Sequence, residues 1–199
     1  AFDVNMENME IIANYQNGHF SIIGKSADDY PQLNIQVEGM NTLTMSAETL
    51  FNGINRSLFA TGDDEIRPIF NGIFFDLQPD ALTFVATDSR KLVRCKNFNV
   101  KGEQTASFIL PKKPANLLKN MLPKESGDIT LHFNDRNAQI TMESSKLICR
   151  LIEGRYPNYN SVIPQNNPFR ATIDRLTMLS ALKRVLIFSN QSSALIKLH

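Results

Sequence analysis

Residues 71–88 read NGIFFDLQPDALTFVATD, and this stretch decides the fold class. Its two ends, residues 71–77 and 82–88, are rich in the aromatic and aliphatic residues that favour strands. Between them, residues 78–81 (QPDA) have the composition of a tight turn. Two strands joined by so short a connection pair antiparallel. The stretch therefore predicts a β-hairpin within an antiparallel sheet.

Further short strands are predicted on both sides of this hairpin. Residues 92–96 (LVRCK) alternate apolar and basic side chains, as a half-buried strand does. Similar patterns predict strands at residues 42–45, 107–110, 128–133, 137–142 and 146–152. Consecutive strands with tight turns between them form antiparallel sheets.

Two helices interrupt the strands. Residues 46–59 carry an apolar stripe at helical spacing, and Ser46 is suited to cap the N-terminus. Residues 114–122 predict a shorter helix, with an apolar stripe and a polar face. The stripe comprises Leu117, Leu118, Met121 and Leu122, and the polar face comprises Lys113, Asn116, Lys119 and Asn120. The middle of the chain thus contains a βαβββ unit twice. The predicted fold class is α+β, with two helices on one face of antiparallel sheets.

The chain is also similar to itself at a distance of about one domain. Residues 44–59 align with residues 172–187 at an offset of 128, and both stretches place a capping residue before an amphipathic helix. The segment around Tyr30-Pro31 aligns with the segment around Tyr156-Pro157 at an offset of 126. A period of this size is typical of whole domains, since solenoid repeats are much shorter.

This repeat predicts the domain organisation. Residues 1–38 are expected to be the second half of one domain, residues 39–166 a complete domain, and residues 167–199 the start of a third. We therefore expect the chain to be a piece of a longer protein with at least three similar domains.

Composition favours an ordinary globular protein. The 199 residues are 42% hydrophobic and 21% charged, apolar runs are too short to cross a membrane, and the N-terminus does not resemble a secretory signal. Two cysteines are too few for a disulfide scaffold, so we expect reduced thiols and a cytoplasmic location.

Charge is distributed unevenly. The formal net charge of +1 combines −5 over residues 1–38, +2 over residues 39–166 and +4 over residues 167–199. Residues 90–101 contain five bases and no acid, and residues 110–124 contain four lysines and no acid. Such runs usually form a solvated face, but they can also form a surface for phosphates.

No motif assembles a catalytic site. Gly24-Lys25-Ser26 resembles the end of a phosphate-binding loop, but the required glycine five positions earlier is His19. A nucleotide-dependent enzyme domain is therefore the weaker alternative. The three histidines lie far apart and none neighbours a cysteine, so we expect no metal site and no cofactor. No nucleophile is paired with a base, which argues against an enzyme.

Three passages carry a family resemblance. They are RPIFNGIFF at residues 67–75, VATDSRKL at residues 85–92, and LIEGRYPNY at residues 151–159, followed by Val162-Ile163-Pro164. Together with the repeat, they resemble the bacterial DNA polymerase III beta subunit family, the replicative sliding clamps. The resemblance covers essentially the whole chain, from the second half of the first domain to the first helix of the third.

The resemblance implies the DNA-clamp fold, with helices inside and sheets outside, and a processivity function in DNA replication without catalysis. Two three-domain protomers would close into a homodimeric ring around duplex DNA, which basic helix faces attract without reading bases. The implied DNA-facing residues are Asn55, Arg56, Lys112, Lys113, Lys119, Lys183 and Arg184.

The family also has a pocket for short linear motifs of the DNA polymerase III alpha subunit, the clamp loader and repair polymerases. The matching residues here are Arg67, Ile69, Phe70, Thr87, Ser89, Arg90, Lys91, Leu92, Pro157, Ser161 and Val162. Phe70, Leu92, Pro157 and Val162 would form the apolar floor, and Arg67 and Lys91 polar anchors at the rim.

This chain departs from the family pattern in several places. The family commonly has glycine and histidine at Ser89 and Arg90, a basic residue at Ser161, and aromatics at Pro68 and Ile69. The wall that the end of the third domain contributes would lie beyond His199. The remaining alternative is another DNA-binding or protein-interaction module of repeated α+β domains without ring closure.

Overall fold

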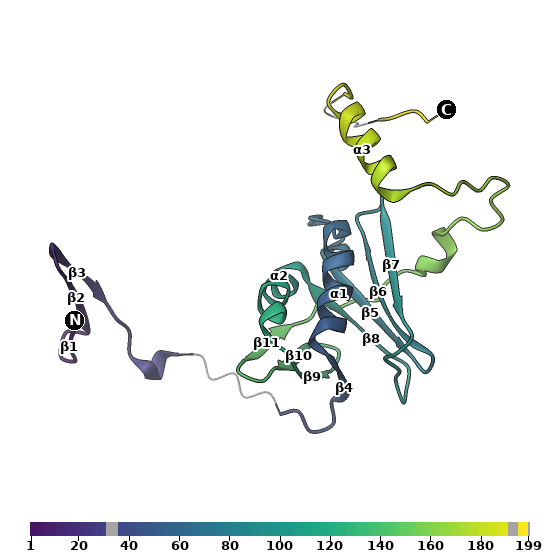
Figure 1. Cartoon of the computed structure of the whole chain (residues 1–199). Helices are drawn as coiled ribbons and strands as arrows, with labels where there is room; N and C mark the ends of the chain where they lie inside the picture. The colour runs from purple at the N-terminus through teal and green to yellow at the C-terminus, as the bar shows by residue number, and fades with distance from the viewer. Residues whose placement is uncertain (31–35, 191–194, 199) are drawn as a thin grey trace. The chain divides into compact units, whose positions relative to one another are not determined.

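The computed structural model describes residues 1–30, 36–190 and 195–198 (Figure 1). It divides into two compact units, Ala1–Tyr156 and Pro157–His199. Pro31 of the predicted repeat and the terminal His199 lie outside the described residues. No helix in the described ranges is both long and apolar enough to cross a membrane.

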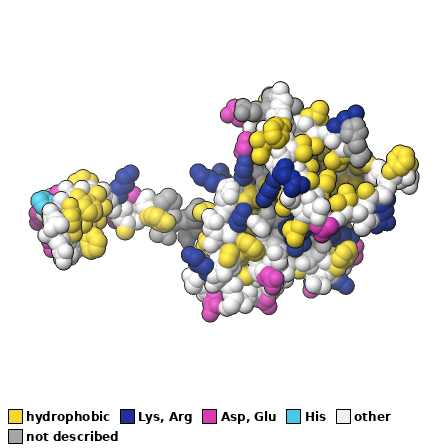
Figure 2. Space-filling view, turned by 45° about the horizontal axis from the view of Figure 1, so that its top comes forward, with side chains coloured by type: hydrophobic (Ala, Val, Ile, Leu, Met, Phe, Trp, Pro, Cys, Tyr) yellow, Lys and Arg dark blue, Asp and Glu magenta, His cyan; other side chains and the backbone are white. Residues whose placement is uncertain are grey.

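The N-terminal segment forms a three-stranded antiparallel sheet of β1 (Phe2–Asn5), β2 (Glu10–Tyr15) and β3 (Gly18–Ile23). Large apolar side chains such as Phe2, Phe20 and Ile23 are exposed on it, and Figure 2 shows hydrophobic side chains gathered there. Beyond β3, Gly24-Lys25-Ser26 leads only into the 3-10 turn Ala27–Asp29. A phosphate-binding loop needs a helix at this point, and the structure has none there.

The central region contains two βαβββ halves, as the sequence predicts. The first half comprises β4 (Asn41–Ser46), α1 (Ala47–Ser57), β5 (Gly72–Gln78), β6 (Ala81–Thr87) and β7 (Leu92–Asn97). The second comprises β8 (Ala106–Pro111), α2 (Lys112–Met121), β9 (Asp128–Phe133), β10 (Asn137–Thr141) and β11 (Lys146–Arg150). All pairings between these strands are antiparallel.

The two halves exchange their first strands. One four-stranded sheet has the order β7-β6-β5-β8, and the other has the order β11-β10-β9-β4. Each half therefore contributes three consecutive strands to one sheet and its first strand to the other. This exchange joins the halves into one folded body, and the sequence pattern gave no sign of it.

The core lies between these sheets and the two helices, which run beside each other in Figure 1. Phe75 packs on Phe84 and Phe108, and Phe108 packs on Phe133, with ring centroids 4.4–4.8 Å apart. Aromatic contacts therefore connect strands of both sheets. Helix α1 approaches its sheet closely at Gly53, where a Cβ atom would lie 2.4 Å from the Phe84 ring.

Helix α2 differs from its prediction in two respects. It begins at Lys112 rather than at residue 114, with Pro111 as N-cap. Its buried stripe is Ala115 and Leu118, continued by Leu122 in the 3-10 turn that follows the helix, whereas Leu117 is 54% exposed. Positions three and seven residues after Ala115 share its face, and Leu117 is turned away from that face. The prediction that Leu117 belongs to the apolar stripe is wrong.

The second unit contains the 3-10 turn Tyr159–Val162 and helix α3 (Arg175–Leu186). Asp174 caps α3 by accepting a 2.8 Å hydrogen bond from the Thr177 amide. Ser46 caps α1 in the same way, accepting a 3.2 Å bond from the Thr49 amide. Helix ends that match at the predicted offset support the alignment of these two segments, while the domain boundaries at residues 38 and 166 stay predictions.

Candidate peptide-binding surface and basic helix faces

The segment before β5 holds a first group of predicted pocket residues, Arg67, Ile69 and Phe70. The Asp64 carboxylate accepts hydrogen bonds from the backbone amides of Ile66 and Arg67 at 2.9 and 3.3 Å. Arg67 also donates to it from Nε and pairs with it through Nη2, both at 2.8 Å. These donors, the Ile66 amide first, lower the pKa of Asp64.

Two further contacts hold this segment in place. The Asn71 side chain accepts from the Asp64 amide and donates to the Asp64 carbonyl, each at 2.8 Å. The Arg67 guanidinium lies 5.3 Å from the centre of the Phe70 ring, within range of a cation–π interaction. Arg67 therefore covers an aromatic ring while its charge is neutralised by Asp64.

The loop from β6 to β7 holds a second group of predicted pocket residues, which are Thr87, Ser89, Arg90, Lys91 and Leu92. Thr87 Oγ1 donates to the Lys91 carbonyl at 2.7 Å and accepts from the Ser89 amide at 3.0 Å. Asp88 accepts from the Arg90 and Lys91 amides, both at 2.9 Å, and forms an ion pair with Lys91 Nζ. The Lys91 ammonium, followed by these two amides, holds the pKa of Asp88 far below its usual range.

Ser89 sits at the tip of this loop with φ +74°. This left-handed conformation is costly for a residue with a Cβ atom and free for glycine. The resemblance leads us to expect glycine at this position, and glycine would adopt this conformation without strain.

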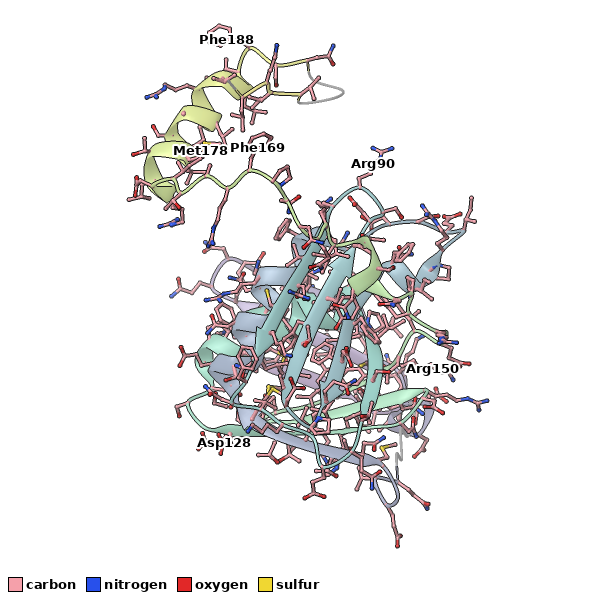
Figure 3. The ribbon with its side chains drawn as sticks, turned by 90° about the vertical axis from the view of Figure 1, so that its right-hand side faces the viewer. Arg90, Asp128, Arg150, Phe169, Met178 and Phe188 are labelled. Atoms are coloured by element: carbon pink, nitrogen blue, oxygen red, sulfur yellow. The ribbon has the colours of Figure 1, made fainter. Side chains whose placement is uncertain are left out.

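The basic side chains of these two groups differ in whether they are already engaged in ion pairs. Arg67 and Lys91 are each paired with an aspartate three residues earlier. Arg90 is exposed, and Figure 3 shows its side chain pointing away from the strands β6 and β7. Arg67 and Lys91, the predicted rim anchors, are thus paired, and among the basic residues predicted for the pocket Arg90 is the one best placed to meet a ligand.

An aromatic cluster lies beside Phe70. The Tyr156 ring stacks on Phe74 with centroids 4.4 Å apart, and it meets Phe70 edge-on at 6.0 Å. Burial raises the pKa of Tyr156 to about 12. Its hydroxyl is buried and has no hydrogen-bond partner among the described residues. Phe70 and Ile69 are half-buried here, so they belong partly to packing and partly to an accessible surface.

The structure brings together only part of the predicted pocket. Ile69 and Phe70 stand on the 3-10 turn Pro68–Phe70, and Leu92 begins β7 with a partly buried side chain. Pro157, Ser161 and Val162 belong to the second unit, where Ser161 Oγ donates to the Asn158 carbonyl at 2.7 Å and Val162 is exposed. Their place in a shared pocket stays a prediction.

The sequence reasoning missed the anchoring residues Asp64, Asn71 and Asp88. A signal for two of them was present, because Asp64 and Arg67, and Asp88 and Lys91, have the same i,i+3 spacing. In loops this spacing lets an aspartate bond both to the following amides and to the basic side chain.

The predicted DNA-facing residues lie on three helices. Asn55 and Arg56 are exposed on α1, and Lys183 and Arg184 are exposed on α3. On α2, Lys113 is exposed, Lys119 is half-buried, and Lys112 forms a 2.5 Å ion pair with Asp63. Lys112 is therefore partly neutralised. Within the described ranges, no group of three or more His, Cys, Asp or Glu side chains could hold a metal ion.

The fold and these surfaces together define a class of protein. Its members have a domain of two βαβββ halves, basic residues on both helices, and surface loops held in place by aspartates, here Asp64 and Asp88. The family model for the central domain of the DNA polymerase III beta subunit matches residues 44–158. Because this match covers more than half of the chain, the protein belongs to the DNA polymerase III beta subunit family.

Curated relatives carry the name beta sliding clamp. The protein from Synechococcus elongatus is 30% identical over 202 residues, which cover 98% of this chain and 54% of that protein. The protein from Borreliella burgdorferi is 31% identical over 144 residues, covering 72% of this chain and 37% of that protein. The chain thus spans about half the length of the first of these relatives. These names describe a clamp and support the prediction that the chain is not an enzyme.

Solved structures show the same fold. The sliding clamp of Bacillus subtilis matches with a TM-score of 0.80 at 22% identity, over 96% of this chain and 50% of that one. The beta subunit of Streptococcus pyogenes matches with a TM-score of 0.82 at 21% identity, over 96% and 52%. The predicted DNA-clamp fold is therefore confirmed.

Proposed function

We propose that this chain is part of a ring-shaped sliding clamp that encircles duplex DNA and tethers polymerase to it. The observation that carries the proposal is the family match over residues 44–158, on a domain that presents basic residues from α1 and α2. The clamp would act in the cytoplasm as a homodimer of three-domain protomers.

The helix faces suit a ring that slides. Arg56 and Lys113 are exposed cations on successive helices of one domain, and such cations attract phosphates without distinguishing bases. Contacts of this kind exchange readily along the duplex, so they favour movement over a fixed position. Retention would then come from topology rather than from affinity.

The anchored loops suit a peptide surface. Phe70 and Leu92 offer partly buried apolar contact, and Arg90 offers an exposed charge at the tip of the β6–β7 loop. We infer that short linear motifs of the DNA polymerase III alpha subunit, the clamp loader and repair polymerases dock here, completed by residues of the third domain.

Retention on DNA of different topology tests this function. The complete protein would be loaded by its clamp loader onto nicked circular DNA, and bound protein would be measured before and after the DNA is cut once. Loss on cutting is the expected result, because a ring slides off a free end. Equal retention on both forms would overturn the ring and favour a module that binds DNA by ordinary affinity.

A further inference from the structure

Lys112 is the residue at which the start of α2 meets the loop before β5. Its backbone amide donates to the Asn71 carbonyl at 3.0 Å, and its ammonium pairs with the Asp63 carboxylate at 2.5 Å. Asp63 precedes Lys112 by 49 residues, so the fold alone brings the two side chains together. These contacts join a helix that is predicted to face DNA to the Gly62–Asn71 loop, which carries the first group of predicted pocket residues.

The Gly62–Asn71 loop is closed at its base. The Gly62 amide donates to the Phe70 carbonyl at 2.7 Å. The Asn71 side chain bonds to both the amide and the carbonyl of Asp64, each at 2.8 Å. Both contacts from α2 end at this base. A change in these contacts therefore acts where the loop is anchored.

The two contacts differ in how easily they can be exchanged. The bond to Asn71 comes from the helix backbone, whereas the ion pair joins two side chains, of which Lys112 is 37% and Asp63 79% exposed. Exposed ion pairs are weak because water solvates each partner almost as well. A DNA phosphate offers a lysine the same charge-assisted hydrogen bonds as a carboxylate, and the flexible stem of lysine can turn from one to the other. A phosphate can therefore replace Asp63 while α2 keeps its place.

The neighbouring charges differ from this pair. Lys113, the next residue of α2, is exposed and forms no ion pair within the described ranges. Glu65, two residues after Asp63, is also exposed, and the described part of the chain gives it no ion-pair partner. Of the two lysines that begin α2, Lys112 is thus the one that must leave a carboxylate before it can meet a phosphate.

We propose that the ion pair of Lys112 and Asp63 is a switch that couples DNA binding to the peptide surface, an inference that rests on the proposed clamp function. Without DNA, the pair holds the Gly62–Asn71 loop against α2, and a loop that is already ordered loses less entropy when a peptide binds. A phosphate that binds Lys112 displaces Asp63 and removes this restraint. DNA and peptide therefore oppose each other at this contact, and by linkage each weakens the other by the same factor.

Duplex binding to the complete protein tests the first half of the switch, with a short fluorescein-labelled duplex as the probe. Asp63→Asn removes the competing charge, and Glu65→Gln, which removes an equal charge from the same loop, is the matched control. We expect Asp63→Asn to bind the duplex about two- to fivefold more tightly than Glu65→Gln. With Lys112→Gln already present, the two variants should bind it equally, because no pair is left to break.

Peptide binding tests the second half of the switch. A synthetic polymerase-tail peptide should bind Asp63→Asn about two- to fivefold more weakly than Glu65→Gln. Saturating duplex should weaken peptide binding by a similar factor in the wild-type protein and have no further effect in Asp63→Asn. Thermal unfolding checks that both variants fold, and amide exchange at Gly62 should be faster in Asp63→Asn.

The outcomes separate the switch from the proposed function. The switch is overturned if Asp63→Asn and Glu65→Gln behave alike with duplex or with peptide. It is also overturned if Lys113→Gln weakens duplex binding and Lys112→Gln does not, although the DNA-facing role of α2 then stands. If neither lysine variant weakens duplex binding, the switch and the DNA-facing role of α2 are both overturned.

Discussion

The two βαβββ halves of the central domain share a topology but fill the space between helix and sheet differently. Seven residues after its N-cap, α1 has Gly53 and α2 has Leu118, and both are fully buried. Gly53 lets α1 lie close to the Phe84 ring of β6, where a Cβ atom would be 2.4 Å away, whereas α2 places a whole leucine side chain in the core. The corresponding helix positions therefore use the space beneath the helix in opposite ways, one by close approach and the other by filling it.

The helix starts differ as well. Ser46 caps α1 with its side chain, and Glu48 stands in the first turn, where the helix dipole favours a negative charge. Helix α2 has no side-chain cap and begins with Lys112 and Lys113. Cations at this end cost about 0.3–1 kcal/mol each, and Lys112 is compensated by Asp63. The second half therefore gives up local stability where the proposed function needs positive charge.

Truncating the buried helix residue should have the largest effect. Leu118→Ala leaves a cavity and should lower the free energy of unfolding by about 2–5 kcal/mol. Gly53→Ala tests the corresponding position of α1 by adding atoms rather than removing them, since the new Cβ would lie 2.4 Å from the Phe84 ring. Overpacking of this kind costs about 1–3 kcal/mol. Urea unfolding measures both, and a neutral Gly53→Ala would show that α1 is free to move outward.

Leu92→Asp tests whether the proposed peptide surface belongs to the first half alone. A charge at this partly buried apolar position should weaken binding of a polymerase-tail peptide to the complete protein by about 100-fold, equal to about 2.7 kcal/mol. The control is Lys146→Asp, at the exposed first residue of β11, which corresponds to Leu92 in β7. Calorimetric titration with unchanged affinity in Leu92→Asp would reject the pocket assignment.

Much of this comparison could be predicted from sequence, because its signals are local. The alternation in residues 92–96 and the turn at residues 78–81 predict β7 and the β5–β6 hairpin, and the structure confirms both. The exchange of β4 and β8 between sheets could not be predicted, since pairing between distant strands leaves no periodic trace in either one.

The site was predicted less completely than the fold. Family resemblance indicates Arg67 and Lys91 as charged anchors, and the structure shows that Asp64 and Asp88 already pair with them. Helix periodicity misplaced Leu117, because an apolar residue at the margin of a stripe can face either way. Local patterns predict which residues lie near a surface. Whether a basic side chain there can contact a ligand depends on which other residues of the loop already pair with it.

Asp88→Asn should have a smaller effect that depends on pH. Asparagine can still accept from the two loop amides, so the change isolates the contact with Lys91. We expect a loss of about 0.5–1 kcal/mol in the free energy of unfolding at pH 7. The folded-state pKa of Asp88 is lowered, so its contribution is present above the unfolded pKa of about 4 and is lost as pH falls below that value.

The difference between the wild-type protein and Asp88→Asn should therefore shrink as pH falls from 5 toward 2. Unfolding curves over this range measure it. Lys91→Met, which keeps much of the apolar stem, should give a similar loss at pH 7 and little further loss when combined with Asp88→Asn. A difference that stays constant with pH would show that the ion pair is not what stabilises the loop.

Ser89→Gly should have the smallest effect, and its sign separates the corresponding turns of the two halves. At φ +74° a serine is strained by about 1–2 kcal/mol, while glycine costs about 0.5–1 kcal/mol of unfolded-state entropy. The net expectation is stabilisation by about 0.5 kcal/mol. Ser144 lies in the β10–β11 turn without a positive φ, so Ser144→Gly should lose about 0.5–1 kcal/mol. Shifts of the unfolding temperature in opposite directions would show that the backbone is strained in the β6–β7 loop and not in the β10–β11 turn. A lower unfolding temperature in both variants would mean instead that Ser89 is not strained.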